Sequence, residues 1–235
     1  MKSNQAISTP IVAPERRPMF TREWNISQRF ARWLIARNVP PNAISLAGMA
    51  GGIVAGLALA ATHLPPLLPQ ALFLLAVAGI VVRGMGNLLD GMVAVGSGKA
   101  SPFGELFNEI PDRVADIAIL VGAGYAAGGN PVLGFIAALA AVFVAYVRAE
   151  GKVTGAAQYY CGPMAKPERM VVVLLISLYC GLMPASWQPV VQIGNQHFGL
   201  MAFGLAVIVL GGIVTVFRRL KRIAGEVSKS YPVQK

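Results

Sequence analysis

The sequence predicts an all-α integral membrane protein with six transmembrane helices, preceded by an N-terminal amphipathic helix in the membrane interface. Two observations favour this class. Of the 235 residues, 55% are hydrophobic and 13% are charged, and the mean hydropathy is +0.61. That composition is typical of multi-spanning membrane proteins rather than soluble domains. The apolar residues also gather in runs of roughly 20, the length at which a helix crosses a bilayer.

Residues 1–20 and 21–37 differ in pattern. Three prolines stand among polar residues in 1–20, so we expect this segment to be disordered. In 21–37, Trp24, Phe30 and Trp33 lie along one side of a helix and Arg22, Arg29 and Arg32 extend a cationic flank. Such a pattern is typical of a helix lying in the lipid headgroup layer. An ordinary helix facing water is the alternative.

Six apolar runs follow, near 43–62, 66–86, 105–127, 132–150, 169–184 and 199–217, and the fifth is the shortest. We expect the second helix to continue through Asn87–Ala94 and the third to begin near Gly104. One membrane domain, 21–222 including the interfacial helix, then accounts for most of the chain. Residues 223–235 are predicted to form a cytoplasmic tail.

The charges predict the orientation. Three alternate connections, around Thr62–Pro65, Gly128–Pro131 and Ala185–Phe198, contain no Lys, Arg, Asp or Glu. All 20 Lys and Arg fall on the other side, which holds the N-terminus, or in helix ends adjoining it. The positive-inside rule makes that side, with both termini, cytoplasmic. We therefore expect a multi-pass protein of a bacterial cytoplasmic (inner) membrane. Because the basic residues recur at the ends of apolar runs, the net charge of +10 does not indicate a nucleic-acid partner.

One polar interruption, Asn87 to Asp116, holds five of the ten acidic residues. Carboxylates near or inside membrane-spanning helices are costly to desolvate and by default mark a site. Helical spacing places Asn87, Asp90, Gly91 and Ala94 on roughly one face, together with Arg83. A second face carries an acidic stripe made by Glu105, Asn108, Asp112 and Asp116, with Glu109 on its flank.

A solvated acidic face with Arg113 as counter-ion is the simplest alternative for that stripe. However, Asp116 leads directly into the apolar run IAILVGAGYAA, so the stripe enters the membrane. Carboxylates on two antiparallel helix ends can converge on a divalent cation, which favours a functional site.

The spacing of these residues resembles the signature of the CDP-alcohol phosphotransferase family, D-x2-D-G-x2-A-R-x8-G-x3-D-x3-D. Five positions match: Asp90, Gly91, Ala94, Gly104 and Asp112. Three depart from it, since Asn87, Val95 and Asn108 replace an Asp, an Arg and an Asp respectively. The match is specific over 26 positions, but the departures affect charged residues.

The resemblance implies a membrane enzyme of phospholipid biosynthesis. It would transfer a phosphatidyl group from a CDP-linked lipid to a small, possibly phosphorylated, alcohol and release CMP. Asp112 would act as the proton acceptor. Mg²⁺ or Mn²⁺ would be held by Asn87, Asp90, Asn108 and Asp112, and Glu105, Glu109 or Asp116 could compensate for the lost carboxylates.

The resemblance also implies where substrates bind. Gly91 and Ala94 would let the nucleotide approach the helix backbone, with Gly104 nearby, and Lys99 could reach a phosphate in place of the family Arg. Arg148, Lys166 and Arg169 would form an anion pocket for the acceptor. Family members also suggest a homodimer.

Two other functions remain open. The chain could be a catalytically silent relative that binds CDP-lipids, because two signature carboxylates are replaced by amides. It could also be a transporter that uses the polar helices as an ion path. Metal-dependent CMP release distinguishes the enzyme from both.

Overall fold

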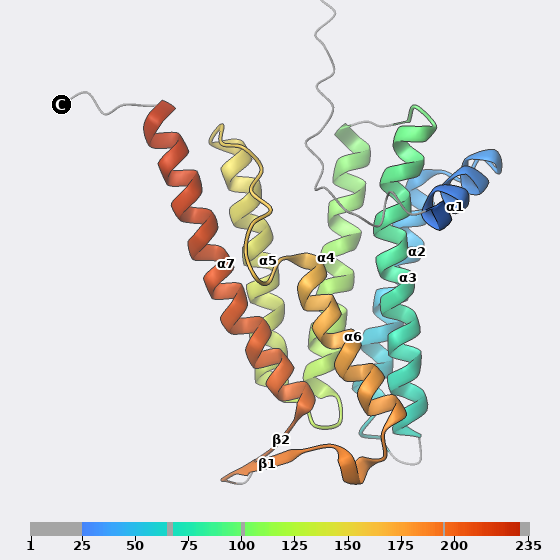
Figure 1. Cartoon of the computed structure of the whole chain (residues 1–235), viewed down its shortest axis with the longest axis vertical. Coiled ribbons are helices and arrows are strands. Elements are labelled where there is room, and N and C mark those ends of the chain that lie inside the picture. The colour runs from blue at the N-terminus through green and yellow to red at the C-terminus, as the bar shows by residue number, and fades with distance from the viewer. Residues whose placement is uncertain (1–24, 65–67, 100–101, 195, 231–235) are drawn as a thin grey trace, which may run out of the picture.

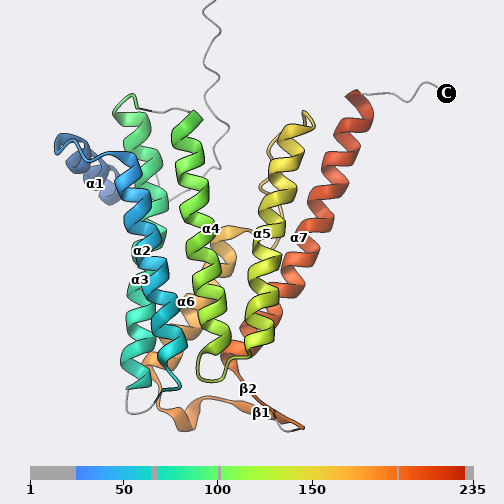
Figure 2. The same cartoon turned by 180° about the vertical axis from the view of Figure 1, so that it is seen from behind.

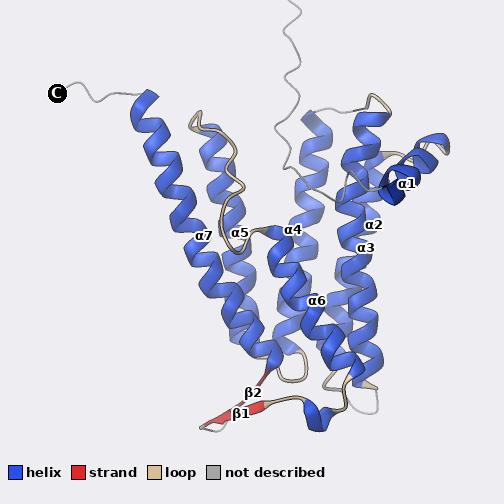
Figure 3. Cartoon of the chain, in the orientation of Figure 1, coloured by secondary structure: helices blue, strands red, loops and turns tan. Residues whose placement is uncertain are grey.

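The computed structural model describes residues 25–64, 68–99, 102–194 and 196–230. This part of the chain folds into seven α-helices and one β-hairpin, drawn in Figures 1 and 3. The helices are α1 (Asn25–Ala36), α2 (Pro41–Ala61), α3 (Pro69–Gly96), α4 (Pro102–Tyr125), α5 (Pro131–Val153), α6 (Lys166–Leu182) and α7 (Leu200–Ser230). The strands are β1 (Val190–Ile193) and β2 (Gln196–Gly199), and a short 3₁₀ turn, Ala185–Trp187, precedes them.

Each of the six apolar runs falls in one helix, from α2 to α7. Four of these helices, α2, α3, α5 and α7, are long and apolar enough to cross a membrane. Charged residues recur in α4 from Glu105 to Asp116, and α6 has only 17 residues. Within the described residues the chain is thus a helical membrane protein with four clear candidate spans, and six spans remain a prediction.

Prolines mark where several helices begin. Pro41, Pro69 and Pro131 each stand in the first turn, where a missing backbone N–H costs nothing and the fixed φ favours the helix. At α5 the Asn130 side chain also accepts a hydrogen bond from the backbone N–H of Leu133 at 3.0 Å. Local sequence therefore sets these boundaries.

Glycines allow α2 to pack closely against both α3 and α4 (Figure 2). A Cβ atom on Gly86 of α3 would lie 2.9 Å from the Gly48 Cα, and one on Gly122 of α4 would lie 2.1 Å from the Gly56 carbonyl oxygen. Neither position has room for a larger residue. Small residues at helix contacts are common in membranes because they let backbones approach. This packing fixes α3 and α4 beside one another.

The connection 154–165 returns into the bundle, so that α6 begins part of the way down its length (Figure 1). Arg219 of α7 holds this connection by donating to the backbone oxygen of Cys161 at 3.1 Å, and it also donates to the backbone oxygen of Val144 in α5 at 2.8 Å. Thr215 accepts from the Met164 N–H at 3.0 Å. These bonds set the depth at which the first turn of α6 meets α4.

The predicted interfacial helix over 21–37 is represented by α1. Its first part, including Trp24, lies outside the described residues. Phe30 and Trp33 stack at 5.5 Å and are 40% and 46% exposed, while Leu34 packs toward Val93 of α3. The helix is therefore present with an exposed aromatic surface, and its location in the interface remains a prediction.

The β-hairpin was not predicted. Residues 190–193 pair antiparallel with 196–199, from Val190 opposite Gly199 to Ile193 opposite Gln196, at the end of the bundle opposite the α7 C-terminus. Gly194 adopts φ +60°, as a tight hairpin turn requires. The Gly194–Asn195 pair between two short runs was the available sequence signal.

Candidate functional site

The two polar arms of the sequence meet at the facing ends of α3 and α4. Asn87 Nδ2 of α3 donates to Asp112 Oδ2 of α4 at 2.9 Å. Arg83 Nη2, one helical turn before Asn87, lies 2.9 Å from Asp112 Oδ1 and 2.9 Å from Asp116 Oδ1. The packing of α2 against both helices holds this arrangement.

Asp90 is buried, with 3% of its surface exposed, and the hydrogen bonds to its carboxylate come from neutral donors. Ser45 Oγ of α2 donates to Asp90 Oδ2 at 2.8 Å, and the backbone N–H of Gly91 donates to Oδ1. Sequence reasoning missed Ser45. Its only signal was a serine hydroxyl near the start of the apolar run 43–62, which resembles many serines that pack between membrane helices.

Asp112 has basic partners on both carboxylate oxygens. Arg83 contacts Oδ1, and Lys166 Nζ, from the first turn of α6, donates to Oδ2 beside the Asn87 amide. The predicted proton acceptor is thus neutralised from two helices. Lys166 reaches it because the 154–165 connection lowers the start of α6 into the bundle.

Asp116 belongs to a deeper ion-paired group. Arg169 Nη2 of α6 lies 2.7 Å from Asp116 Oδ2, and both side chains are 2% exposed. Arg113 approaches the same oxygen at 3.8 Å. Buried charges of this kind must be paired, because an isolated one is strongly destabilising. Asp116 was predicted as a compensating carboxylate and Arg169 as an acceptor-binding residue. In the structure the two form an ion pair with each other.

Glu109 lies at a more exposed part of the site and bridges two arginines. Arg148 Nη2 of α5 lies 2.7 Å from Glu109 Oε1, and Arg113 of the same helix contacts Oε2. The Arg148 guanidinium also lies 5.3 Å from the Tyr160 ring centre. The network therefore joins α4, α5 and the 154–165 connection.

The remaining predicted residues lie around this network. Gly91 is buried and Ala94 half-buried on α3, and Gly104 stands in the first turn of α4. Lys99 is exposed after α3, where its backbone N–H donates to the Ala94 carbonyl at 3.0 Å. Glu105 lies in α4, but its side chain is outside the described atoms.

A divalent cation would find a limited set of oxygen ligands here. In the described residues, no three His, Cys, Asp or Glu side chains come together as a metal site. However, Asn108 Oδ1 is buried and has no hydrogen-bond partner there, and Asp90 bonds to neutral donors only. Carboxylate and amide oxygens are the hard ligands that Mg²⁺ and Mn²⁺ prefer. The site therefore offers oxygen ligands of the type that a divalent ion prefers.

A second ion of the same charge would meet a site already rich in positive charge. Four carboxylates, Asp90, Glu109, Asp112 and Asp116, lie among five basic side chains, Arg83, Arg113, Arg148, Lys166 and Arg169. At these separations a cation inside a protein repels another by several kcal/mol, on the order of 4 kcal/mol at 4 Å. Arg83 and Lys166 place two positive charges beside Asp112.

Comparison with known proteins assigns the family. The CDP-alcohol phosphatidyltransferase model matches residues 38–217. A phosphatidylinositol phosphate synthase of Streptomyces avermitilis is 29% identical over 216 residues, which cover 89% of this chain and 81% of that protein.

Solved structures agree at the level of the fold. The phosphatidylinositol phosphate synthase of Mycobacterium tuberculosis with CDP-DAG bound is 18% identical, with a TM-score of 0.65 over 85% of this chain and 94% of that one. The same enzyme in complex with manganese and citrate gives a TM-score of 0.65 at 18% identity, over 84% of this chain and 88% of that one. From its sequence match over most of its length, this chain belongs to the CDP-alcohol phosphatidyltransferase family.

Proposed function

We propose that this protein transfers a phosphatidyl group from a CDP-linked lipid to a small alcohol, with release of CMP, as a step of phospholipid biosynthesis. The observation that carries the proposal is the placement of Asp90 and Gly91 on α3 opposite Asp112 on α4, at the family's own spacing. CDP-DAG bound to the structural relative supports the donor class. The acceptor is an alcohol, free or phosphorylated.

Asp112 is the proposed proton acceptor. Its carboxylate takes the proton of the acceptor hydroxyl as that oxygen attacks the lipid-side phosphorus of the diphosphate, and the bond from this phosphorus to CMP breaks. A positioned carboxylate of this kind contributes about 100-fold or more to a rate. Asn87 and Arg83 hold Asp112 in place through Oδ2 and Oδ1.

Lys166 exchanges partners in this proposal. In the structure its ammonium group neutralises Asp112. A substrate diphosphate offers a stronger anion, so Lys166 moves to a phosphate oxygen and frees Asp112 Oδ2 for the acceptor hydroxyl. Lys166 is suited to this because 22% of its side chain is exposed, whereas the Arg169–Asp116 pair beneath it is sealed.

One divalent cation, Mg²⁺ or Mn²⁺, completes the site. Asp90, Asp112 and the amide oxygens of Asn87 and Asn108 would hold it. When bound, such an ion neutralises the diphosphate and the charge that develops on the departing CMP oxygen. Manganese in the structural relative supports a divalent cofactor.

The other predicted residues have proposed positions around the substrates. Gly91, Ala94 and Gly104 border the nucleotide, Lys99 reaches its phosphates, and Arg148 faces the acceptor. Arg169 acts through Asp116 by fixing the first turn of α6.

The proposed topology has six spans in one membrane domain, 21–222, with the site and both termini cytoplasmic in a bacterial inner membrane. A homodimer is the proposed assembly.

The test uses the purified full-length protein in lipid nanodiscs. Labelled CDP-diacylglycerol is supplied with Mg²⁺ or Mn²⁺ and a panel of free and phosphorylated alcohols, and both CMP and labelled lipid product are measured. We expect CMP release that needs a metal and one class of alcohol. Formation of labelled lipid product without release of CMP would contradict the proposal. Ion flux without release of CMP would contradict it too and would favour a transporter.

A silent CDP-lipid-binding protein is the second candidate. The observation that favours it is Asp112, whose two oxygens are both occupied by basic side chains. In that case labelled CDP-diacylglycerol would bind and compete with CDP, but no alcohol on the panel would release CMP. The same experiment separates the two functions.

A further inference from the structure

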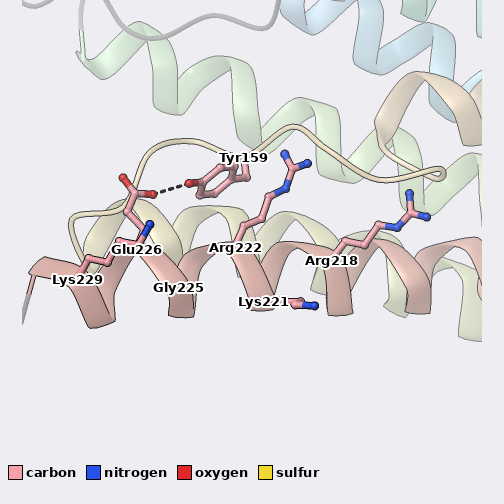
Figure 4. A pocket seen from close by; sticks show the side chains of 7 residues that line it. All are labelled: Tyr159, Arg218, Lys221, Arg222, Gly225, Glu226 and Lys229. Carbon is pink, nitrogen blue, oxygen red and sulfur yellow. Dashed lines mark hydrogen bonds between the residues drawn. The ribbon is translucent and has the colours of Figure 1, made fainter. Parts of the chain in front are cut away.

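A cluster of basic side chains lies away from the acidic site, near the C-terminal end of α7. Arg218, Lys221, Arg222 and Lys229, here called the α7 basic cluster, line a hollow of about 560 Å³ with Tyr159, Gly225 and Glu226 (Figure 4). The hollow lies between α7 and the connection 154–165. None of these residues belongs to the site described above.

Helical spacing gathers the cluster on one face. At about 100° per residue, Arg218, Arg222, Gly225 and Lys229 fall within an arc of about 60°, and Lys221 stands beside it. Gly225 leaves the middle of this face open, since a Cβ atom there would meet nothing within 4 Å. The hollow therefore has cationic edges and free space at its centre.

The one carboxylate of the hollow already has donors. Glu226 Oε2 accepts from Tyr159 Oη at 2.7 Å and from the Ala157 N–H at 3.2 Å. The hydrogen bond to Glu226 raises the pKa of the Tyr159 phenol above its ordinary value, so the phenol stays a neutral donor. In the described part of the chain, Arg218, Lys221 and Lys229 form no ion pair, while the Arg222 guanidinium lies 5.9 Å from the Tyr159 ring centre.

An apolar strip leads along α7 to the cluster. Val207 and Val214 are 51% and 41% exposed and lie within about 40° of Arg218 around the helix axis. Leu210, 65% exposed, flanks them. An acyl chain lying on this strip would bring its headgroup beside Arg218. A soluble anion would make no use of these exposed valines.

Depth along the helix separates the four cations. With a rise of 1.5 Å per residue, Arg218, Lys221 and Arg222 lie within about 8 Å of Phe217, the last apolar residue of the run, and Lys229 lies about 18 Å beyond it. The headgroup layer is roughly 5–8 Å thick on each side of the hydrocarbon core. Three cations thus fall at headgroup depth and Lys229 extends into water.

We propose that Arg218, Lys221 and Arg222 bind the phosphate group of an anionic phospholipid whose acyl chain lies along Val207–Val214. The site is separate from the acidic site and does not depend on the transfer reaction. It differs from general attraction of basic residues to the membrane because one face of one helix supplies both the cations and the apolar strip.

The test counts bound lipid by native mass spectrometry of the full-length protein, released from detergent with equal phosphatidylglycerol and phosphatidylcholine. Each cation near a membrane surface contributes about a fivefold preference for anionic lipid. We expect Lys221→Gln to weaken phosphatidylglycerol retention about fivefold and the triple variant R218Q/K221Q/R222Q to lose it. Lys229→Gln is the matched control and should leave retention unchanged.

Three other outcomes would overturn the proposal. Equal retention of the two lipids by the native protein means no headgroup selectivity. A loss in Lys229→Gln as large as that in Lys221→Gln means attraction by net charge alone. Millimolar inorganic phosphate could displace phosphatidylglycerol from the native protein while the triple variant fails to retain the lipid. That result would identify a free anion as the ligand. If the triple variant does not fold, the comparison of the two lysine variants decides the matter.

Discussion

Arg83 on α3 and Asp116 on α4 form a buried ion pair, with 2.9 Å between Nη2 and Oδ1 and side chains that are 4% and 2% exposed. The same nitrogen lies 2.9 Å from Asp112 Oδ1. One guanidinium therefore joins the two helices on which the proposed chemistry depends.

Arg83→Met should destabilise the protein. Removing one partner of a buried pair leaves an uncompensated charge and costs about 3–5 kcal/mol in the free energy of unfolding. We expect the lower end of this range because Arg169 and Lys166 still neutralise the two carboxylates. Arg148→Met is the control: its partner Glu109 is 38% exposed, so the loss should be about 1 kcal/mol or less. Unfolding in mixed detergent measures both, and equal losses would contradict the buried pairing.

Asp112→Asn should lower CMP release by at least about 100-fold, because it removes the proposed proton acceptor. Asp90→Asn should cause a comparable loss through the metal, and added Mn²⁺ should partly restore its rate. Initial rates over a range of metal concentrations distinguish the two. The control Glu105→Gln should retain most of its activity. If an active native protein keeps its rate in the Asp90→Asn, Asp112→Asn double variant, the site lies elsewhere.

Lys166→Met should strengthen metal binding, since the Lys166 ammonium repels a cation beside Asp112. Removing a unit charge at this range changes the affinity at least about fivefold. Electron paramagnetic resonance of free Mn²⁺ gives the affinity and the number of ions without any turnover. Lys229→Met should have no effect. If the native protein binds two Mn²⁺ ions, the basic side chains do not take the place of a second metal.

Restoring the family carboxylates should change the number of metal ions. The variant with Asn87→Asp and Asn108→Asp adds two negative charges beside Asp90 and Asp112. We expect it to bind a second Mn²⁺ ion and to require a different metal concentration for half-maximal CMP release. CMP release that appears only after this restoration would identify the native chain as the silent binder.

The proposed orientation can be tested by labelling single cysteines after Cys161 and Cys180 are replaced. His63→Cys and Gln192→Cys should react with an impermeant maleimide from outside, and Ser228→Cys only after the membrane is opened. These side chains are exposed, whereas the neighbouring Thr62 is 2% exposed and is unsuitable. Reaction of Ser228→Cys in sealed cells would reverse the predicted topology.

Much of this molecule follows from the sequence by itself. Runs of about 20 apolar residues specify helices, prolines such as Pro41 and Pro131 mark where they begin, and the signature spacing places Asp90 and Asp112 on facing helix ends. These features are local, because helix periodicity depends only on neighbours three and four residues apart.

The partners of the acidic residues were decided by tertiary structure. Ser45 reaches Asp90 from 45 residues away, Lys166 reaches Asp112 from 54, and Arg169 reaches Asp116 from 53. Spacing states which residues share a face of one helix, but not which other helix packs on that face or at what depth. Here the depth of α6 depends on the 154–165 connection, and the approach of α3 to α4 depends on glycine contacts with α2. Close packing between distant segments therefore determined which carboxylates are neutralised within the chain and which are left with neutral donors.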